Sequence, residues 1–245
     1  MTKTAIITGA SGGIGSSLCS AYSSSGYRVI ATDRVKNQDL TCDFFVECDL
    51  MRFVRDEAYR AAKSAELRTA AGGSLNTLVN NAATQILGTT DMLTAQQWHD
   101  TLDVNLIAPF LLTQQFLSEL EASQGSVVNI SSVHQTATKP EFVAYATSKS
   151  ALSGMTRAMS VDLGSRIRVN AIAPAATATP MLLAGFEGKD EKFKELSSMH
   201  PIGRIASPEE ISNVALFLSS SKSSFITGAV IAADGGISGR LHDPV

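Results

Sequence analysis

The sequence has few of the features that mark a secreted scaffold, a membrane protein or a nucleic-acid-binding protein. It contains three cysteines in 245 residues and no C-x-x-C pair, so it predicts neither a disulfide framework nor a cysteine-based metal or redox site. Lys and Arg number 20 against 23 Asp and Glu, and this net charge of -3 gives no basic surface for nucleic acid or anionic membranes. The longest apolar stretch, 104–117, is interrupted by polar residues and proline and is too short to span a membrane.

The chain also lacks a recognisable secretory signal. Its first ten residues lead directly into a strand-like run, without a charged leader, an apolar block or a small-residue cleavage site. Because the odd cysteine count also favours a reducing compartment, we expect a soluble cytoplasmic protein. Hydrophobic residues make up 44% of the chain and charged residues 18%, which excludes disorder and predicts one sizeable core.

Short β-branched runs alternate with longer helical patterns along the chain. The predicted strands are 5–8, 28–32, 44–46, 75–79, 127–130, 167–172 and 229–232, and the predicted helices are 14–24, 52–70, 95–120, 144–163, 191–198 and 208–218. In several of these strands no polar residues alternate with the apolar ones, which is typical of strands covered by helices on both faces. This order predicts an α/β, single-domain, doubly wound Rossmann fold over residues 1–245, with a parallel sheet of about seven strands flanked by helices.

Residues 177–201 form the one long apolar segment outside this alternation, with Pro180 and two glycines beside the cluster 181–183. The segment follows the carboxyl end of a predicted strand, which is where open α/β sheets bind their ligands. A helix pair packed on the surface is the plainer interpretation. We favour a substrate-binding loop or lid.

A glycine-rich turn, residues 8–15, joins the first predicted strand to the first predicted helix. Gly9, Gly13 and Gly15 allow the backbone to bend sharply and to approach a phosphate at the positive end of that helix. Asp33 ends the second predicted strand, where an acid can accept hydrogen bonds from an adenosine ribose. A carboxylate there repels a 2′-phosphate, so NAD is favoured over NADP. A simple capping acid is the alternative for Asp33, and the adjacent Arg34 could admit a phosphate.

The spacing of Tyr145 and Lys149 places a phenol and an ammonium on one face of a predicted helix. A phenol needs its pKa lowered by about three units, roughly 4 kcal/mol, to act as a base near neutral pH. Lys149 and a positively charged nicotinamide ring could together supply that. Ser132 follows the fifth predicted strand and can hydrogen-bond the same substrate oxygen. A solvated surface pair can show the Tyr-x-x-x-Lys spacing too, but its combination with Ser132, Asp33 and the glycine turn indicates hydride transfer.

Together these motifs resemble the classical short-chain dehydrogenase/reductase family over nearly the whole chain. The matching segments are 8–15, Asp49-Leu50, 80–82, Asn105, 129–132, Tyr145 with Lys149, 168–174, 226–228 and 234–236. The resemblance implies that Asn105, Ser132, Tyr145 and Lys149 are catalytic, with Asn105 helping to hold a water in a proton relay to the lysine. The choice of Ser132 over Ser131 rests on the family spacing to the tyrosine.

The resemblance also implies a cofactor site. The predicted cofactor-binding residues are Gly9, Ser11, Gly13, Ile14, Gly15 and Asp33, with Asp49 and Leu50 bordering the adenine, Asn81 and Ala82 lining the ribose, Thr177 and Thr179 orienting the nicotinamide carboxamide, and Tyr145, Lys149 and Pro174 completing the set. Ala83 and Ala175 depart from the family pattern, because each replaces a glycine and adds a methyl group near the cofactor.

The mouth of the predicted site carries polar and aromatic side chains that suggest a polar substrate. The predicted substrate residues are Gln85, Ser132, His134, Phe142 and Met181. For His134, a hydrogen bond to a loop carbonyl is an equally good interpretation. The other histidines, His99, His200 and His242, show no metal-ligand spacing and are interpreted as surface or packing residues, so no metal is expected.

The sequence therefore predicts an NAD-dependent oxidoreductase acting on a secondary alcohol or ketone, with a sugar, polyol or small hydroxy acid favoured. An NADPH-dependent 3-oxoacyl thioester reductase and a non-catalytic dinucleotide-binding sensor are the alternatives. Apolar residues on more than one helix face, namely Phe110, Phe116, Met155 and Met159, suggest a subunit interface. We expect a homo-oligomer, a dimer or tetramer, with no nucleic acid or membrane partner.

Overall fold

A computed structural model describes residues 2–241, a range that excludes His242. One seven-stranded sheet runs through the molecule in the order β3-β2-β1-β4-β5-β6-β7, and every neighbouring pair is parallel. The strands are β1 (Lys3–Thr8), β2 (Tyr27–Asp33), β3 (Phe44–Glu47), β4 (Thr77–Asn80), β5 (Ser126–Ile130), β6 (Arg168–Pro174) and β7 (Val230–Ala233). The predicted doubly wound parallel sheet is confirmed.

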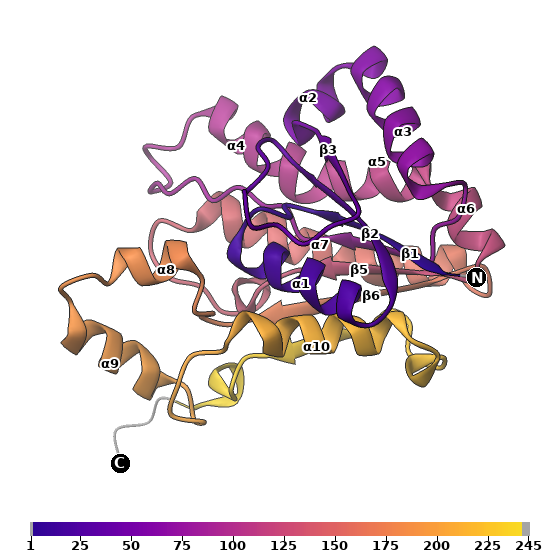
Figure 1. Cartoon of the computed structure of the whole chain (residues 1–245). Helices are drawn as coiled ribbons and strands as arrows, with labels where there is room; N and C mark the ends of the chain where they lie inside the picture. Colours follow the sequence, from indigo (N-terminus) through magenta and orange to yellow (C-terminus); the bar gives the residue numbers. More distant parts are fainter. Residues whose placement is uncertain (1, 242–245) are drawn as a thin grey trace.

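Helices cover both faces of this sheet (Figure 1). They are α1 (Gly13–Ser24), α2 (Leu50–Arg55), α3 (Glu57–Ala71), α4 (Ala95–Leu102), α5 (Ala108–Gln115), α6 (Leu117–Ala122), α7 (Val143–Leu163), α8 (Pro180–Gly185), α9 (Asp190–Met199) and α10 (Pro208–Ser219). One apolar core lies beneath α1 and α10, and a second lies beneath α3, α5 and α7. Burial on both faces explains why the central strands show no polar alternation.

The single helix predicted over 52–70 is wrong, because the chain forms α2 and α3 with a break between them. Asp56 has an extended backbone there, and its carboxylate accepts from the backbone N–H of Tyr59 at 3.0 Å. The same carboxylate pairs with Arg52 at 3.2 Å. Asp56 is thus the N-cap that starts α3, and an Asp used in this way marks a helix start.

The single helix predicted over 95–120 is also wrong. Residues 103–107 are a π-helical turn between α4 and α5, and a second break falls at Phe116. Pro109 stands in the first turn of α5 and has no N–H to donate to the carbonyl of Asn105 four residues earlier. The proline therefore explains why the regular α-helical ladder is interrupted beside Asn105.

Of the four residues predicted at a subunit interface, Phe110 alone is exposed. Phe116 is fully buried in the core beneath α5, so that part of the prediction is wrong. Met159 packs partly against the same core, and Met155 is half-buried. A helix that is apolar on several faces can bury them all within one chain when helices flank it on both sides.

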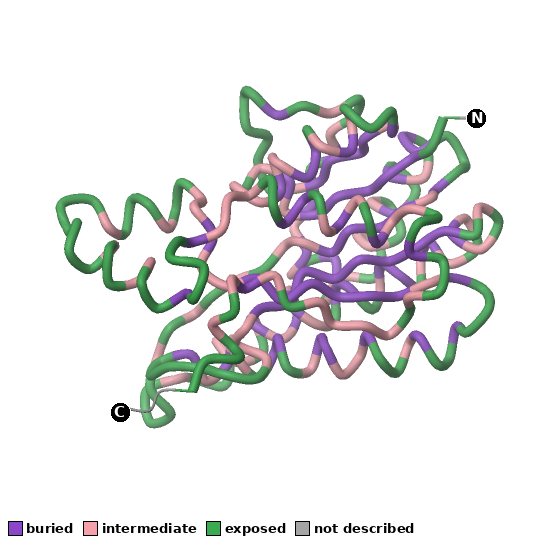
Figure 2. The backbone as a smooth tube through the Cα atoms, turned by 90° about the horizontal axis from the view of Figure 1, so that it is seen from below, coloured by how far each residue is buried: buried purple, intermediate pink, exposed green. Residues whose placement is uncertain are grey.

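The segment 177–201 contains α8 and α9, so most of the predicted loop is helical. Both helices extend away from the sheet and are largely exposed (Figure 2). The chain on either side of α8 and α9 is held together, because Ala178 N–H donates to Ala206 O at 2.8 Å and Ala206 N–H donates to Ala176 O at 3.0 Å. We call residues 177–201 the lid segment from here on.

The carboxyl ends of the central strands bring the predicted motifs to one edge of the sheet. The glycine turn follows β1, Asp33 ends β2, Ser132 follows β5 and the lid segment follows β6. Buried side-chain hydrogen bonds link β4 and β5 to α7, because Asn80 donates to Asn129 at 2.8 Å and Asn129 donates to Thr156 at 2.9 Å. Within residues 2–241, no helix is long and apolar enough to cross a membrane.

Candidate active site

The glycine turn fits the close backbone approach that a dinucleotide phosphate needs. Gly9 has φ of 62°, and a Cβ there would lie 2.6 Å from Ala82 Cα. A Cβ on Gly15 would lie 2.0 Å from the Gly9 carbonyl oxygen. Neither position accepts a larger residue, so the turn stays narrow and its N–H groups stand at the start of α1.

Hydrogen bonds fix this turn against the end of β4. Thr8 Oγ1 accepts from the N–H groups of Asn81 and Ala82, both at 3.0 Å. The Asn81 amide donates to the carbonyls of Thr8 and Gly9, each at 3.0 Å. The predicted ribose residues Asn81 and Ala82 therefore also hold the shape of the glycine turn.

Asp33 lies at the end of β2 beside the glycine turn. One carboxylate oxygen accepts from the N–H of Ser11 at 3.0 Å, and the other accepts from the N–H of Arg34 at 2.7 Å. Ser11 Oγ donates to Val35 O at 2.6 Å, which holds the following loop against the turn. These contacts hold a negative charge beside the glycine turn, at the carboxyl end of β2.

Three other predicted cofactor residues, Asp49, Leu50 and Thr179, have structural contacts of their own. Asp49 caps α2 by accepting from Met51 N–H at 2.8 Å, and Leu50 is almost fully buried in the core. Thr179 caps α8 and lies directly against the glycine turn, since a Cβ on Gly13 would come within 2.8 Å of its side chain. The first residues of the lid segment thus contact the glycine turn.

Tyr145, Ser132 and Lys149 come together at the start of α7. The Ser132 side chain lies close enough to the Tyr145 hydroxyl to lower its pKa. Lys149 is 2% exposed, its Nζ donates to Ile130 O at 2.7 Å, and Nζ lies 5.7 Å from the centre of the Tyr145 ring. One helical turn therefore holds a phenol and an ammonium on the same side, as the spacing predicts.

The electrostatics of this group differ from the sequence expectation. Burial raises the pKa of Tyr145, and the nearby Ser132 side chain only partly opposes that rise. Burial lowers the pKa of Lys149 from its ordinary 10.5 to about 8. The groups of the protein alone therefore leave the Tyr145 pKa above its ordinary value.

Ser131 and Ser132 have different partners, which the sequence could not distinguish. Ser131 Oγ faces inward and hydrogen-bonds Ser153 Oγ at 2.8 Å and Lys149 O at 3.1 Å. Ser132 contacts Tyr145 and accepts from the N–H of His134 at 3.2 Å. Ser131 thus ties β5 to α7, whereas Ser132 lies beside the phenol.

Asn105 joins the loop after β4 to α7 from within the π-helical turn. Its side-chain oxygen accepts from Thr84 N–H at 2.8 Å, and its amide donates to Thr84 O and to Ser148 Oγ, both at 2.9 Å. Ser148 donates in turn to Tyr145 O at 2.7 Å. Sequence reasoning missed Ser148 and Pro109, although a proline four residues after Asn105 is a readable signal of an interrupted helix.

An aromatic group lies beside the phenol. The His134 ring stacks on Phe142 with centroids 4.5 Å apart, and both rings meet Tyr145 edge-on at 5.8 and 5.9 Å. Burial and the nearby Lys139 lower the pKa of His134. His134 Nδ1 contacts Thr138 Oγ1 at 3.2 Å rather than a loop carbonyl. Gln85 and Met181, the other predicted substrate residues, are exposed.

Comparison with known proteins agrees with this fold. The family model described as enoyl-(acyl carrier protein) reductase matches residues 9–238. An acetoacetyl-CoA reductase of Acinetobacter sp. is 33% identical over 244 residues, covering 96% of this chain and 97% of that protein. A D-threitol dehydrogenase of Mycolicibacterium smegmatis is 32% identical over 246 residues, covering 96% and 92%.

Solved structures give the same result. The ligand-free aldohexose dehydrogenase of Thermoplasma acidophilum has a TM-score of 0.92 at 30% identity, covering 100% of this chain and 97% of that one. A mutant 4-hydroxyisoleucine dehydrogenase complexed with NADH and succinate has a TM-score of 0.87 at 28% identity, covering 98% and 100%. The chain belongs to the short-chain dehydrogenase/reductase family, a family of oxidoreductases with a Rossmann nucleotide-binding fold.

We expect Lys149→Met to stabilise the protein. A fall in pKa from 10.5 to about 8 corresponds to roughly 3 kcal/mol of unfavourable charge burial, and leaving the Ile130 carbonyl without its donor offsets about 1–2 kcal/mol of the gain. Urea unfolding at neutral pH should therefore show a net increase of about 1–2 kcal/mol. The exposed Lys192→Met is the matched control and should change stability by less than about 0.5 kcal/mol.

The same pair of variants has a defined pH dependence. Lys149 has a lower pKa folded than unfolded, so its penalty is fully present below pH 8 and fades between about pH 8 and 10.5. The advantage of Lys149→Met should shrink across that window. A variant that is less stable than the parent at neutral pH would contradict the assigned burial cost.

Proposed function

We propose that this protein is an NAD-dependent dehydrogenase that interconverts a secondary alcohol and its ketone. The observation that carries this proposal is the placement of Tyr145 near Ser132 and above the buried Lys149, whose Nζ lies 5.7 Å from the centre of the Tyr145 ring. A phenol and a hydroxyl that meet at the carboxyl end of a parallel sheet can share one substrate oxygen. A non-catalytic sensor would have no use for that pairing.

The proposed roles follow from this geometry. Ser132 hydrogen-bonds the substrate oxygen and stabilises its developing negative charge, while Tyr145 takes the hydroxyl proton during oxidation and returns it during reduction. A bound nicotinamide supplies the hydride acceptor or donor. Lys149 holds positive charge under the phenol, and Asn105 keeps the loop after β4 aligned with α7 and supports the proton relay.

The cofactor assignment rests on the glycine turn and Asp33. Backbone N–H groups at the start of α1 would bind the pyrophosphate, and the Asp33 carboxylate would accept from the ribose hydroxyls. Thr179 already contacts the glycine turn, which supports a place for the lid segment next to the cofactor. Because the carboxylate is oriented by two backbone N–H groups, NAD is favoured over NADP.

A sugar, polyol or small hydroxy acid is the substrate class we favour. His134 lies against Phe142 and Tyr145, and its lowered pKa keeps the ring neutral, so it can exchange hydrogen bonds with substrate hydroxyls. Relatives named for threitol and aldohexose support that class. The acetoacetyl-CoA reductase relative favours a second candidate, an NADPH-dependent 3-oxoacyl thioester reductase.

The proposal also covers the domain organisation, the localisation and the oligomeric state. We propose that the chain is one nucleotide-binding domain with a lid over the substrate, and that it works in the cytoplasm. Phe110 on α5 and Val161 on α7 are 43% and 84% exposed, and these apolar side chains support a homo-oligomer, a dimer or tetramer.

Replacing Asp33 tests the cofactor assignment. Asp33→Asn removes the charge and keeps an oxygen for the Ser11 N–H, so the ratio of kcat/KM with NAD to that with NADP should fall by at least about tenfold. Asp39→Ala, an exposed acid in the next loop, makes the same change in net charge and should leave the ratio unchanged. An unaltered preference in Asp33→Asn would remove Asp33 from the cofactor site.

Replacing Tyr145 tests the proposed reaction. With the reduced-nicotinamide absorbance band as readout, sugars, polyols, hydroxy acids and acetoacetyl thioesters are assayed with both cofactors. Tyr145→Phe should lower kcat by about 100- to 10,000-fold on the best substrate, because it removes the proton-transferring hydroxyl. Tyr27→Phe, a change on β2 outside the catalytic set, should keep full activity.

The assay of these substrate classes with both cofactors separates the alternative functions. A preference for acetoacetyl thioesters with NADPH would favour the thioester reductase. Binding of a cofactor without turnover of any substrate would favour the non-catalytic sensor. Retained activity in Tyr145→Phe would overturn the assigned proton transfer.

A further inference from the structure

The Ser11 side chain ties the loop after β2 to the glycine turn. Its Oγ donates to Val35 O at 2.6 Å and accepts from the N–H of Asn37 at 3.2 Å. A serine hydroxyl has one proton, and the contact with Val35 uses it. While this contact is made, the hydroxyl has no proton left for a phosphate, so any role that it has in the cofactor site is indirect.

The loop depends on these two hydrogen bonds for its position. Residues 34–39 are all exposed, and Val35 itself is 73% exposed, so no buried side chain anchors this stretch. The next buried residue is Leu40, which packs in the core beneath α1 and α10. Ser11 therefore holds the loop close to the point where it leaves β2.

The same loop helps to orient the Asp33 carboxylate. The backbone of Asp33 is fixed by the sheet, because its carbonyl accepts from the N–H of Cys48 at 2.9 Å. Its carboxylate is fixed by two N–H groups, that of Ser11 at 3.0 Å and that of Arg34 at 2.7 Å. Since Arg34 is the first residue of the loop, Ser11 positions both donors, one directly and the other through the loop.

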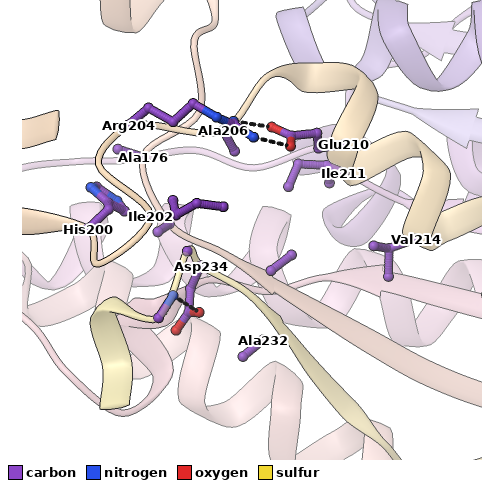
Figure 3. A pocket seen from close by; sticks show the side chains of 14 residues that line it. Ala176, His200, Ile202, Arg204, Ala206, Glu210, Ile211, Val214, Ala232 and Asp234 are labelled. Carbon is purple, nitrogen blue, oxygen red and sulfur yellow. Dashed lines mark hydrogen bonds and ion pairs between the residues drawn. The ribbon is translucent and has the colours of Figure 1, made fainter. Parts of the chain in front are cut away.

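Within residues 2–241, two cavities, one beside Ser11 and one at the root of the lid segment, are lined by no unpaired Lys or Arg. The first, of about 490 Å³, is lined by Asn37 and by the acidic Glu209. The second, of about 360 Å³, is lined by Arg204, which binds Glu210 through two contacts of 2.8 Å (Figure 3). Neither cavity therefore favours the extra phosphate of NADP.

We propose that the Ser11 hydroxyl is a positioning group that sets the preference for NAD over NADP, because it holds the loop that keeps the Asp33 carboxylate in one orientation. This inference rests on the proposed function, since it needs a dinucleotide whose ribose lies at Asp33. A carboxylate with one orientation accepts from the ribose hydroxyls of NAD and faces the 2′-phosphate of NADP with its full charge. A carboxylate that can turn away loses part of both effects, so the two dinucleotides become more alike.

The test measures the dissociation constants of NADH and NADPH by fluorescence, so it needs neither a substrate nor turnover. Ser11→Ala removes the hydroxyl and keeps the N–H that donates to Asp33. The ratio of the NADPH constant to the NADH constant should fall by about three- to tenfold. Ser11→Thr keeps a hydroxyl and should retain the ratio within about twofold, as should the matched control Ser20→Ala, which changes an exposed serine on α1.

Asp33→Asn separates a positioning role from a direct one. Once the carboxylate is gone, adding Ser11→Ala should change the ratio by less than about twofold, because the charge that the hydroxyl positions is absent. An equal fall in both backgrounds, or an unchanged ratio in Ser11→Ala alone, would contradict this proposal and leave the cofactor assignment intact. A parent protein that binds neither dinucleotide would contradict the proposed function, and this proposal with it.

Circular dichroism checks that each variant is folded. If Ser11→Ala is not, Ser11→Cys takes its place, because a thiol is only a weak donor and a weak acceptor. The same fall in the ratio is then expected, and an unchanged ratio contradicts the proposal in the same way.

Discussion

The hydrogen bond from the Lys149 ammonium to the Ile130 carbonyl is the interaction on which the site depends. It holds the first turns of α7 against the end of β5, so that Tyr145 and Ser132 meet above it. The charge is almost fully buried, and its pKa falls to about 8 as a result. Burying this cation under the phenol therefore lowers the free energy of unfolding, and such a cost is common at functional sites.

This burial also limits what the protein can do alone. Loss of water raises the Tyr145 pKa, although Ser132 and Lys149 are near. The phenol therefore stays protonated at neutral pH until another positive charge arrives beside it. An oxidised nicotinamide brings such a charge, so the proposed base becomes effective only when the glycine turn and Asp33 have bound the cofactor. In this account, cofactor binding and base activation are one event.

The sequence predicted the features that arise from local pattern. Runs of β-branched residues without alternating polar positions predicted all seven strands. The glycine turn could also be predicted, because a position such as Gly15 has no room for a larger residue. Helix interruptions were missed because apolar periodicity continues through Asp56 and through the π-helical turn. Contacts between distant segments, such as that of Ser131 with Ser153, depend on packing and leave no mark in a single sequence.

The most direct test of this account is an ultraviolet titration of the Tyr145 phenolate. The spectrum of Tyr145→Phe is subtracted from that of the unsubstituted protein across alkaline pH, with and without NAD⁺. Without NAD⁺, Tyr145 should ionise above its ordinary pKa of 10, and saturating NAD⁺ should move that ionisation to lower pH. Ionisation near neutral pH in the protein alone, or no change on adding NAD⁺, would contradict the account.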